Sequence, residues 1–174
     1  MKKVLISAFK PFYKSKNNYS MEVLSQINLD VDKVILDVVY DECYIDLKKL
    51  NLDSYDLIVA LGEARSRSEL TVEKQAVNLS SCSISDNKGI IKNNEIIDNR
   101  FENIIQTNID LDKIKKYASV SFDAGKFVCN NLYFHLLCDY PDKSLFIHIP
   151  ECHDDLGNYK EYAIYIENII KTLI

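Results

Sequence analysis

The chain has 174 residues, of which 47% are hydrophobic, and only 4 are glycine and 3 are proline. This composition excludes disordered and fibrous proteins and predicts one globular domain over residues 1–174. The net charge is −5 and the basic residues are scattered, so we expect small molecules or peptides as partners rather than nucleic acid. The apolar run before Lys10 is too short for a signal peptide or a membrane span, and we expect a cytoplasmic protein without a membrane partner.

The cysteines are odd in number and far apart in the sequence, without the CxxC spacing of disulfide or zinc frameworks. We therefore expect five free thiols, at Cys43, Cys82, Cys129, Cys138 and Cys152. The stretch from Cys152 to Asp155 also lacks the spaced ligand sets of structural zinc. We predict a solvated loop there and no metal site.

Strands and helices alternate along the first third of the chain. Apolar and β-branched runs, helical spacing and a serine cap predict a strand at 3–8, a helix at 20–27, a strand at 33–40, a helix at 42–50 and a strand at 57–61. Gly62 stops the last of these strands.

The middle of the chain has a weaker pattern, and the alternation then resumes. Residues 69–79 are strand-like, and residues 80–99 are polar with a turn signal at 86–89, which predicts a hairpin or a loop. The rest predicts a helix at 111–117, a strand at 119–122, a helix at 127–138, a strand at 144–149 and a helix at 159–174. The fold class predicted is α/β, a three-layer α/β/α sandwich with a mixed, largely parallel central sheet.

Cys129 lies in the first turn of the predicted helix at 127–138. Unpaired backbone N–H groups and the positive end of the helix dipole favour a thiolate there. The helix descends about 18 Å and the next strand climbs about as far, so a right-handed crossover returns the chain to the same edge of the sheet at His148. A histidine beside a cysteine can act as base and later as acid, and we therefore expect a nucleophilic thiol.

Each of these residues also has a plainer interpretation. Cys129 falls on the core-facing stripe of its helix, where a free cysteine is often a small buried hydrophobe. Glu73, in an apolar-flanked run, is a candidate for orienting the imidazole, because a buried carboxylate needs a partner; the alternative is a solvent-facing strand residue. His135 is expected on the polar side of the Cys129 helix.

Four segments, in this order, resemble the motifs of the pyroglutamyl peptidase type I family, cysteine peptidases that remove N-terminal pyroglutamate. They are FKPF at 9–12, LGEARSR at 61–67 leading into TVEKQAVNL at 71–79, AGKFVCNNLYFHLL at 124–137, and FIHIP at 146–150. The last two are the most specific. The resemblance covers about residues 3–150.

The resemblance implies acyl transfer without a metal or organic cofactor, on a peptide with a blocked N-terminus. It implies Cys129 as nucleophile, His148 as acid and base, and Glu73 as the orienting carboxylate. It further implies an apolar pocket for the neutral lactam ring, lined by Phe9, Phe12, Ile84, Phe127 and Val128. Without the resemblance, core or strand packing explains these five residues.

The chain also departs from the family pattern around these motifs. Tyr13-Lys14 replaces Gly-Gly, so the first loop is expected to run differently. Glu63 replaces a Gln, and Asp123 and Lys126 are unusual beside Cys129; Lys126 is expected to point to solvent. Two other functions therefore stay open: a cysteine amidohydrolase acting on a different amide or lactam, and a non-catalytic binding module. Relatives form homo-oligomers, and the shorter 90–109 segment leaves the oligomeric state open.

Overall fold

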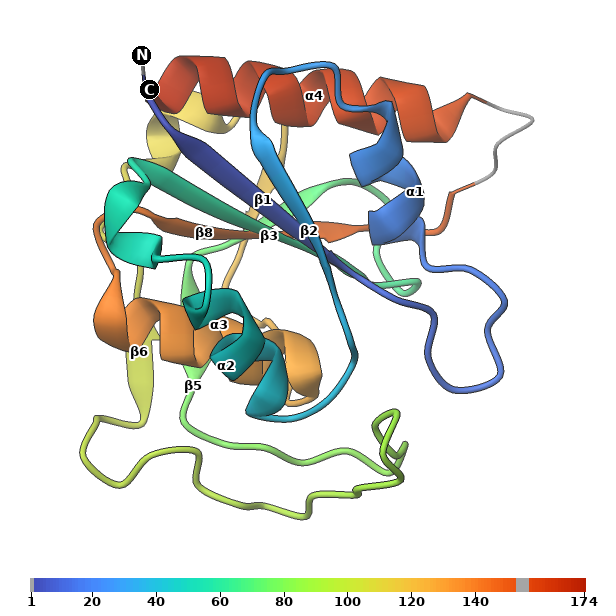
Figure 1. Ribbon diagram of the computed structural model, residues 1–174, viewed down its shortest axis with the longest axis vertical. Helices are drawn as coiled ribbons and strands as arrows, with labels where there is room; N and C mark the ends of the chain where they lie inside the picture. The colour runs from blue at the N-terminus through green and yellow to red at the C-terminus, as the bar shows by residue number, and fades with distance from the viewer. Residues whose placement is uncertain (1, 153–156) are drawn as a thin grey trace.

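The computed structural model describes residues 2–152 and 157–174, and its centre is a six-stranded sheet with helices on both faces (Figure 1). The strand order is β2-β1-β3-β8-β4-β7. The strands are β1 (Val4–Phe9), β2 (Asp32–Leu36), β3 (Leu57–Glu63), β4 (Thr71–Glu73), β7 (Ser119–Ser121) and β8 (Ser144–Ile149). A second, two-stranded sheet pairs β5 (Gln75–Val77) with β6 (Ile104–Gln106).

Strands β2, β1, β3 and β8 are parallel to one another. Strand β4 enters antiparallel to β8, and β7 is parallel to β4. The sheet is thus mixed and mostly parallel, which confirms the predicted fold class. β1, β3 and β8 are buried along their whole length, apart from the last residue of β3.

Helices cover both faces of the sheet. α1 (Tyr19–Gln26) and α4 (Asn158–Leu173) lie on one face, and α2 (Glu42–Lys48) and α3 (Val128–Asp139) lie on the other (Figure 1). The Asn18 side chain accepts the backbone N–H of Ser20 and so begins α1. Among the described residues, no helix is long and apolar enough to cross a membrane.

The predicted strand at 33–40 ends early, at Leu36. Its partner β1 ends at the paired residue Phe9, and the Asp37 carboxylate then accepts the backbone N–H of Val38 and turns the chain. Val38 and Tyr40 are nevertheless buried in the core beneath α2 and α3. The hydrophobic side chains of Val38 and Tyr40 therefore indicate burial and not strand structure.

The middle of the chain differs most from the prediction. The strand-like run at 69–79 is two short strands, β4 and β5, which belong to different sheets because Lys74 interrupts them. Residues 80–99 form an irregular loop, one of the two structures predicted for them. Strand β6 was not predicted, because its three residues are too few for a recognisable strand pattern. The predicted helix at 111–117 is a single 3-10 turn, Leu111–Ile114, and the 3-10 turn Leu52–Ser54 was not predicted. His153 to Asp155 lie outside the described residues.

Candidate active site

Cys129 is the second residue of α3, and a tight turn after β7 places it at the rim of the sheet. Gly125 has φ +77°, and its N–H donates to the Asp123 carboxylate at 2.9 Å. No side chain caps the start of α3. The first backbone N–H groups of α3, which include that of Cys129, therefore have neither an acceptor within the helix nor a side-chain cap.

His148 lies one residue before the end of β8, directly beside Gly62 of β3 in the parallel register. A methyl group built on Gly62 would lie 2.8 Å from the Cys129 Sγ. The sulfur therefore sits against the backbone of the strand that neighbours His148, and adjacent strands are about 4.8 Å apart. Cys129 and His148 also line the same pocket. The structure thus brings the two predicted residues together at one edge.

Glu73 reaches His148 across the one antiparallel pairing of the sheet. Thr71 lies opposite His148, so Glu73 is the diagonal neighbour on the same face. The Glu73 Oε1 is 2.8 Å from the His148 Nδ1, and the Glu73 side chain is fully buried. This bond leaves Nε2 as the imidazole nitrogen available to the pocket. Glu73 is therefore a buried carboxylate with a partner, as burial demands.

Arg67 supports Glu73 and was not singled out from the sequence. Its Nη2 lies 3.4 Å from the Glu73 Oε1, and it donates to the Ser121 Oγ at 3.0 Å and to the Asp123 backbone oxygen at 2.6 Å. One guanidinium thus ties β4, β7 and the turn before α3 together. The buried Tyr133 hydroxyl adds a bond of 2.8 Å to the Glu73 backbone oxygen. In the sequence, Arg67 stands six residues before Glu73. Because a buried carboxylate needs a partner, this nearby cation could have been predicted to contact Glu73.

The pocket beside Cys129, here called the thiol pocket, has a volume of about 170 Å³ and mainly apolar walls. Its walls are Phe9, Phe12, Asn18, Val38, Glu63, Ala124, Phe127 and Val128, together with Cys129 and His148. The centroids of the Phe12 and Phe127 rings are 5.7 Å apart, and the rings are tilted by 39°. Four of the five residues expected to contact substrate therefore lie here, whereas Ile84 lines a neighbouring hollow that shares Phe12. The pocket suits a small ring and not a bulky side chain.

Glu63 contributes the acidic group of the thiol pocket wall. Its side chain is 3% exposed, and its Oε2 accepts the backbone N–H of Tyr19, the first residue of α1, at 2.8 Å. Its Oε1 accepts from the Arg65 Nε at 2.7 Å. The carboxylate is therefore matched by a cation and by a helix N-terminus, which is how a buried charge is tolerated.

The Cys129 thiol is less acidic than the sequence suggested. Burial is the main cause, followed by the negative charges of Glu73 and Glu63, and together they raise its pKa to about 12, although a backbone N–H at the helix start acts in the opposite direction. These effects oppose the thiolate that the helix start favours. The neutral thiol is favoured in the unliganded protein, so any reaction at this sulfur needs a base, and His148 is placed to supply one.

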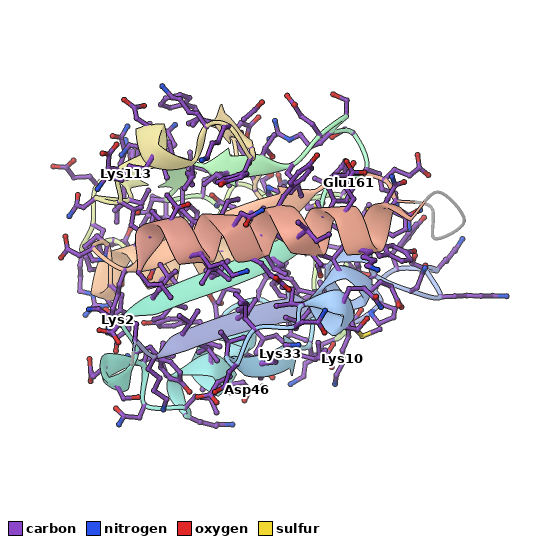
Figure 2. All side chains as sticks on the ribbon, turned by 90° about the horizontal axis from the view of Figure 1, so that it is seen from above. Lys2, Lys10, Lys33, Asp46, Lys113 and Glu161 are labelled. Carbon is purple, nitrogen blue, oxygen red and sulfur yellow. The ribbon has the colours of Figure 1, made fainter. Side chains whose placement is uncertain are left out.

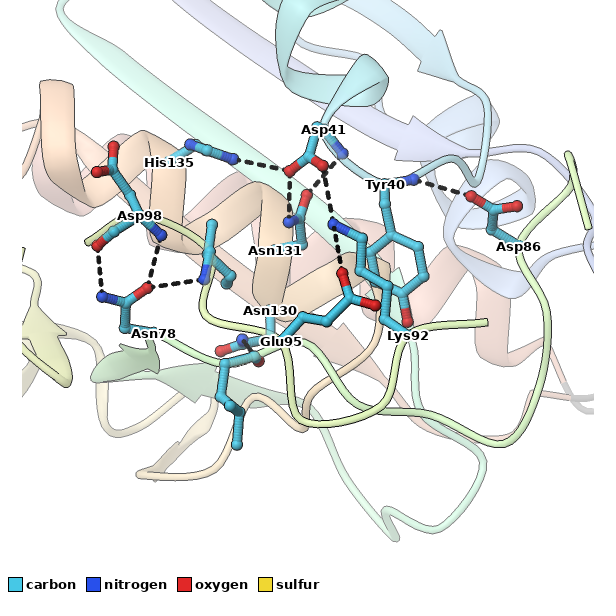
Figure 3. Close-up of polar contacts among 12 residues, drawn as sticks. Tyr40, Asp41, Asn78, Asp86, Lys92, Glu95, Asp98, Asn130, Asn131 and His135 are labelled. Carbon is cyan, nitrogen blue, oxygen red and sulfur yellow. Dashed lines mark hydrogen bonds and ion pairs between the residues drawn. The ribbon is translucent and has the colours of Figure 1, made fainter. Parts of the chain in front are cut away.

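Other candidates from the sequence lie away from the thiol pocket. The His135 Nε2 is 3.2 Å from the Asp41 Oδ1 (Figure 3). The His135 ring also stacks on Tyr44, so this histidine does not lie on a purely polar face of α3. Asp41 also binds Asn131 and Lys92, which fastens the loop at 80–99 to α3. Lys126 is exposed, as expected. Within residues 2–152 and 157–174, no three histidine, cysteine or acidic side chains are grouped as metal ligands.

Comparisons with known proteins agree with this geometry. A family model described as "Pyroglutamyl peptidase" matches residues 2–171. A pyrrolidone-carboxylate peptidase of Brachyspira hyodysenteriae is 32% identical over 85% of this chain and 83% of its own length. The fold is shared with the solved structure of pyroglutamyl peptidase I from Bacillus amyloliquefaciens, which has a TM-score of 0.90 and 24% identity over 99% of this chain and 97% of that chain. It is also shared with the solved structure of pyrrolidone carboxyl peptidase from Thermococcus litoralis, which has a TM-score of 0.88 and 26% identity over 99% of this chain and 93% of that chain. The chain belongs to the pyroglutamyl peptidase family.

Proposed function

We propose that the protein removes pyroglutamate from the N-terminus of peptides, with Cys129 as nucleophile, His148 as general acid and base, and Glu73 as the carboxylate that orients the imidazole. The observation that carries this assignment is the Glu73–His148 bond of 2.8 Å at the rim of a pocket that also holds the Cys129 thiol. Membership of the pyroglutamyl peptidase family supports the substrate class.

The first half of the reaction acylates the enzyme. The His148 Nε2 takes the Cys129 thiol proton as the sulfur attacks the carbonyl carbon that follows the lactam ring. The carbonyl oxygen becomes an oxyanion, which the uncapped N–H groups at the start of α3 stabilise. Glu73 stabilises the imidazolium while it exists. Collapse of the intermediate breaks the C–N bond, and the imidazolium gives its proton to the departing amine.

The second half restores the thiol. A water molecule gives a proton to His148 and attacks the thioester carbonyl, and the C–S bond then breaks. The Cys129 sulfur recovers its proton from His148, and free pyroglutamate leaves. No cofactor enters either step. Because burial raises the pKa of the Cys129 thiol, we place the proton transfer to His148 in the same step as the attack.

The thiol pocket supports a neutral ring as the acyl group. Phe9, Phe12, Phe127 and Val128 offer apolar surface, and the Glu63 charge is already matched by Arg65. An uncyclised N-terminal residue would carry an ammonium group into this site and lose its hydration without a free partner. The pocket therefore favours a lactam over an ordinary N-terminus.

Hydrolysis of a fluorogenic pyroglutamyl amide tests the proposal. We expect turnover by the native chain and none above background in Cys129→Ala. Cys138→Ala is the matched control, because it removes a second, partly buried thiol from the same helix and should retain turnover. Absence of turnover by the native chain, or equal turnover in Cys129→Ala, would contradict the assignment.

We further propose a cytoplasmic location. The support is chemical: the reaction needs a reduced Cys129, and all five cysteines are unpaired thiols, a pattern typical of reducing compartments. Fractionation of cells that produce the protein would test this, and a secreted, active enzyme would contradict it.

A further inference from the structure

A second hollow, here called the basic hollow, adjoins the thiol pocket. It has a volume of about 640 Å³, and its walls include Phe12, Lys14, Lys16, Glu63, Arg65 and Ile84. Phe12 and Glu63 belong to both cavities, so the two spaces meet at these side chains. A substrate whose ring fills the thiol pocket must send the rest of its chain out of it, and the basic hollow is an adjoining space open to solvent.

The charge of the basic hollow is positive although the whole chain carries −5. Its acid, Glu63, is buried and neutralised by Arg65. Lys14 and Lys16 are exposed, and neither forms an ion pair with any described residue, whereas Lys10 nearby is paired with Asp37 at 3.3 Å. Glu151, exposed after β8, is the other described acid that acts on Arg65. Two lysines in the hollow that adjoins the thiol pocket thus have no acidic partner among residues 2–152 and 157–174.

Arg65 gives the basic hollow a fixed wall. Its Nε is bound to Glu63, its Nη2 donates to the Ser15 Oγ at 2.8 Å, and its guanidinium lies over the Tyr19 ring at 5.2 Å. These contacts tie the loop at 10–18 to the end of β3. The backbone that carries Lys14 and Lys16 is therefore fastened beside the thiol pocket at Ser15, and a cleft with an excess of positive charge concentrates the opposite charge.

We propose that the basic hollow binds a carboxylate in the leaving part of the substrate, so that peptides with an acidic group just after the pyroglutamyl residue are the preferred substrates. This inference rests on the proposed function. The carboxylate can come from an aspartate or glutamate side chain or from the C-terminus of a dipeptide. Lys14 and Lys16 attract it, and the apolar surface of Ile84 and Phe12 contacts the rest of the residue.

Three matched substrates separate the sources of the carboxylate. They are pyroglutamyl-glutamine amide, which is neutral, pyroglutamyl-glutamate amide, which has a side-chain carboxylate, and pyroglutamyl-glutamine with a free C-terminus. At low ionic strength we expect kcat/KM to be about fivefold higher for one or both acidic substrates than for the neutral one, with the ratio falling toward one as salt screens the exposed lysines. The acidic substrate that shows the preference identifies the source.

The double variant Lys14→Gln/Lys16→Gln should bring the acidic-to-neutral ratio to about one. Lys113→Gln/Lys116→Gln is the matched control, since it removes the same charge from exposed positions, and Figure 2 shows Lys113 at the opposite end of the sheet from Lys10. This control should keep the ratio of the native chain. Equal kcat/KM for all three substrates, or a preference that survives in the first variant, would overturn the inference alone. If none of the three substrates is hydrolysed, the proposed function is overturned instead.

Discussion

The thiol pocket and the basic hollow share two wall residues but are built in opposite ways. At the thiol pocket the buried carboxylates have partners: Glu73 meets His148 and Arg67, and Glu63 meets Arg65. In the basic hollow two lysines are exposed without a described acidic partner. The first site is held by strand register and helix packing, whereas the second depends on an irregular loop at 10–18.

This difference separates the chemistry from the choice of substrate. A one-residue change of register between β4 and β8 would turn Glu73 away from His148. The relative position of these two side chains is therefore fixed by the same strand pairing that forms the core. Lys14 and Lys16 in the loop at 10–18 carry no such constraint, because their side chains are exposed. Substitutions there can alter which peptides are accepted and leave the thiol where it is.

The largest effect is expected from Glu73→Gln. The amide keeps the size of the side chain but cannot balance the charge of the imidazolium, so kcat should fall by about 10² to 10⁴. The measurement is turnover of the pyroglutamyl amide, with far-UV circular dichroism to check folding. Glu102→Gln, on an exposed carboxylate, is the control and should behave as the native chain. Equal rates for both variants would show that Glu73 does not orient the base.

Gly62→Ala should give the next largest effect. The added methyl would lie 2.8 Å from both the Cys129 Sγ and the buried Phe146 ring, so the sulfur or the ring must shift. Such overpacking costs about 1–3 kcal/mol, and a displaced thiol should also slow turnover. Thermal unfolding and kcat together measure it.

Gly89→Ala provides the comparison for Gly62→Ala. A Cβ at Gly89 meets nothing within 4 Å, but φ is +82°, so only backbone strain is added. It should lose stability and keep its turnover. If Gly62→Ala also kept full turnover, the close contact between β3 and the sulfur would not matter for the reaction.

The sequence predicted the alternation of strands and helices, the meeting of Cys129 and His148 at one edge of the sheet, and, through the family resemblance, Glu73. The parallel crossover from 119–122 to 144–149 was wrong, because β7 is parallel to β4 and β4 is antiparallel to β8. The sequence could not predict that β4 is antiparallel to β8, because three residues carry no directional pattern. From the sequence, Gly62 could be recognised only as the end of a strand. Its close approach to the Cys129 Sγ and the Phe146 ring depends on tertiary packing, which the sequence pattern does not show. The surroundings of the Cys129 thiol could not be read from the sequence for the same reason: the helix start is local, whereas burial and two distant carboxylates raise the pKa of the thiol.

The pH dependence of Cys129 alkylation tests that last point. Because its pKa is raised to about 12, the thiol is almost wholly protonated at pH 7, and raising the pH increases the reactive thiolate. The rate with iodoacetamide should therefore rise about tenfold per pH unit between pH 7 and pH 9. Peptide mapping by mass spectrometry would follow Cys129 separately from the other cysteines. Glu63→Gln removes one of the negative charges that oppose ionisation and should speed the reaction at each pH; a rate already independent of pH at 7 would show a resting thiolate instead.

The smallest effect concerns the loop at 10–18. Tyr13 stands where the family motif has glycine, and it adopts φ +48°, a left-handed conformation that favours glycine. Tyr13→Gly and Tyr13→Ala both remove the ring, which is 57% exposed, but only glycine also removes the strain. Glycine should therefore be the more stable of the two by about 1 kcal/mol, after its greater freedom in the unfolded chain is subtracted. Urea unfolding measures the difference, and an alanine variant at least as stable as the glycine variant would mean that the loop is not held in this conformation. Since Lys14 and Lys16 are unchanged, both variants should keep the preference for acidic substrates, which ties that preference to the charge of the basic hollow and not to the strained residue beside it.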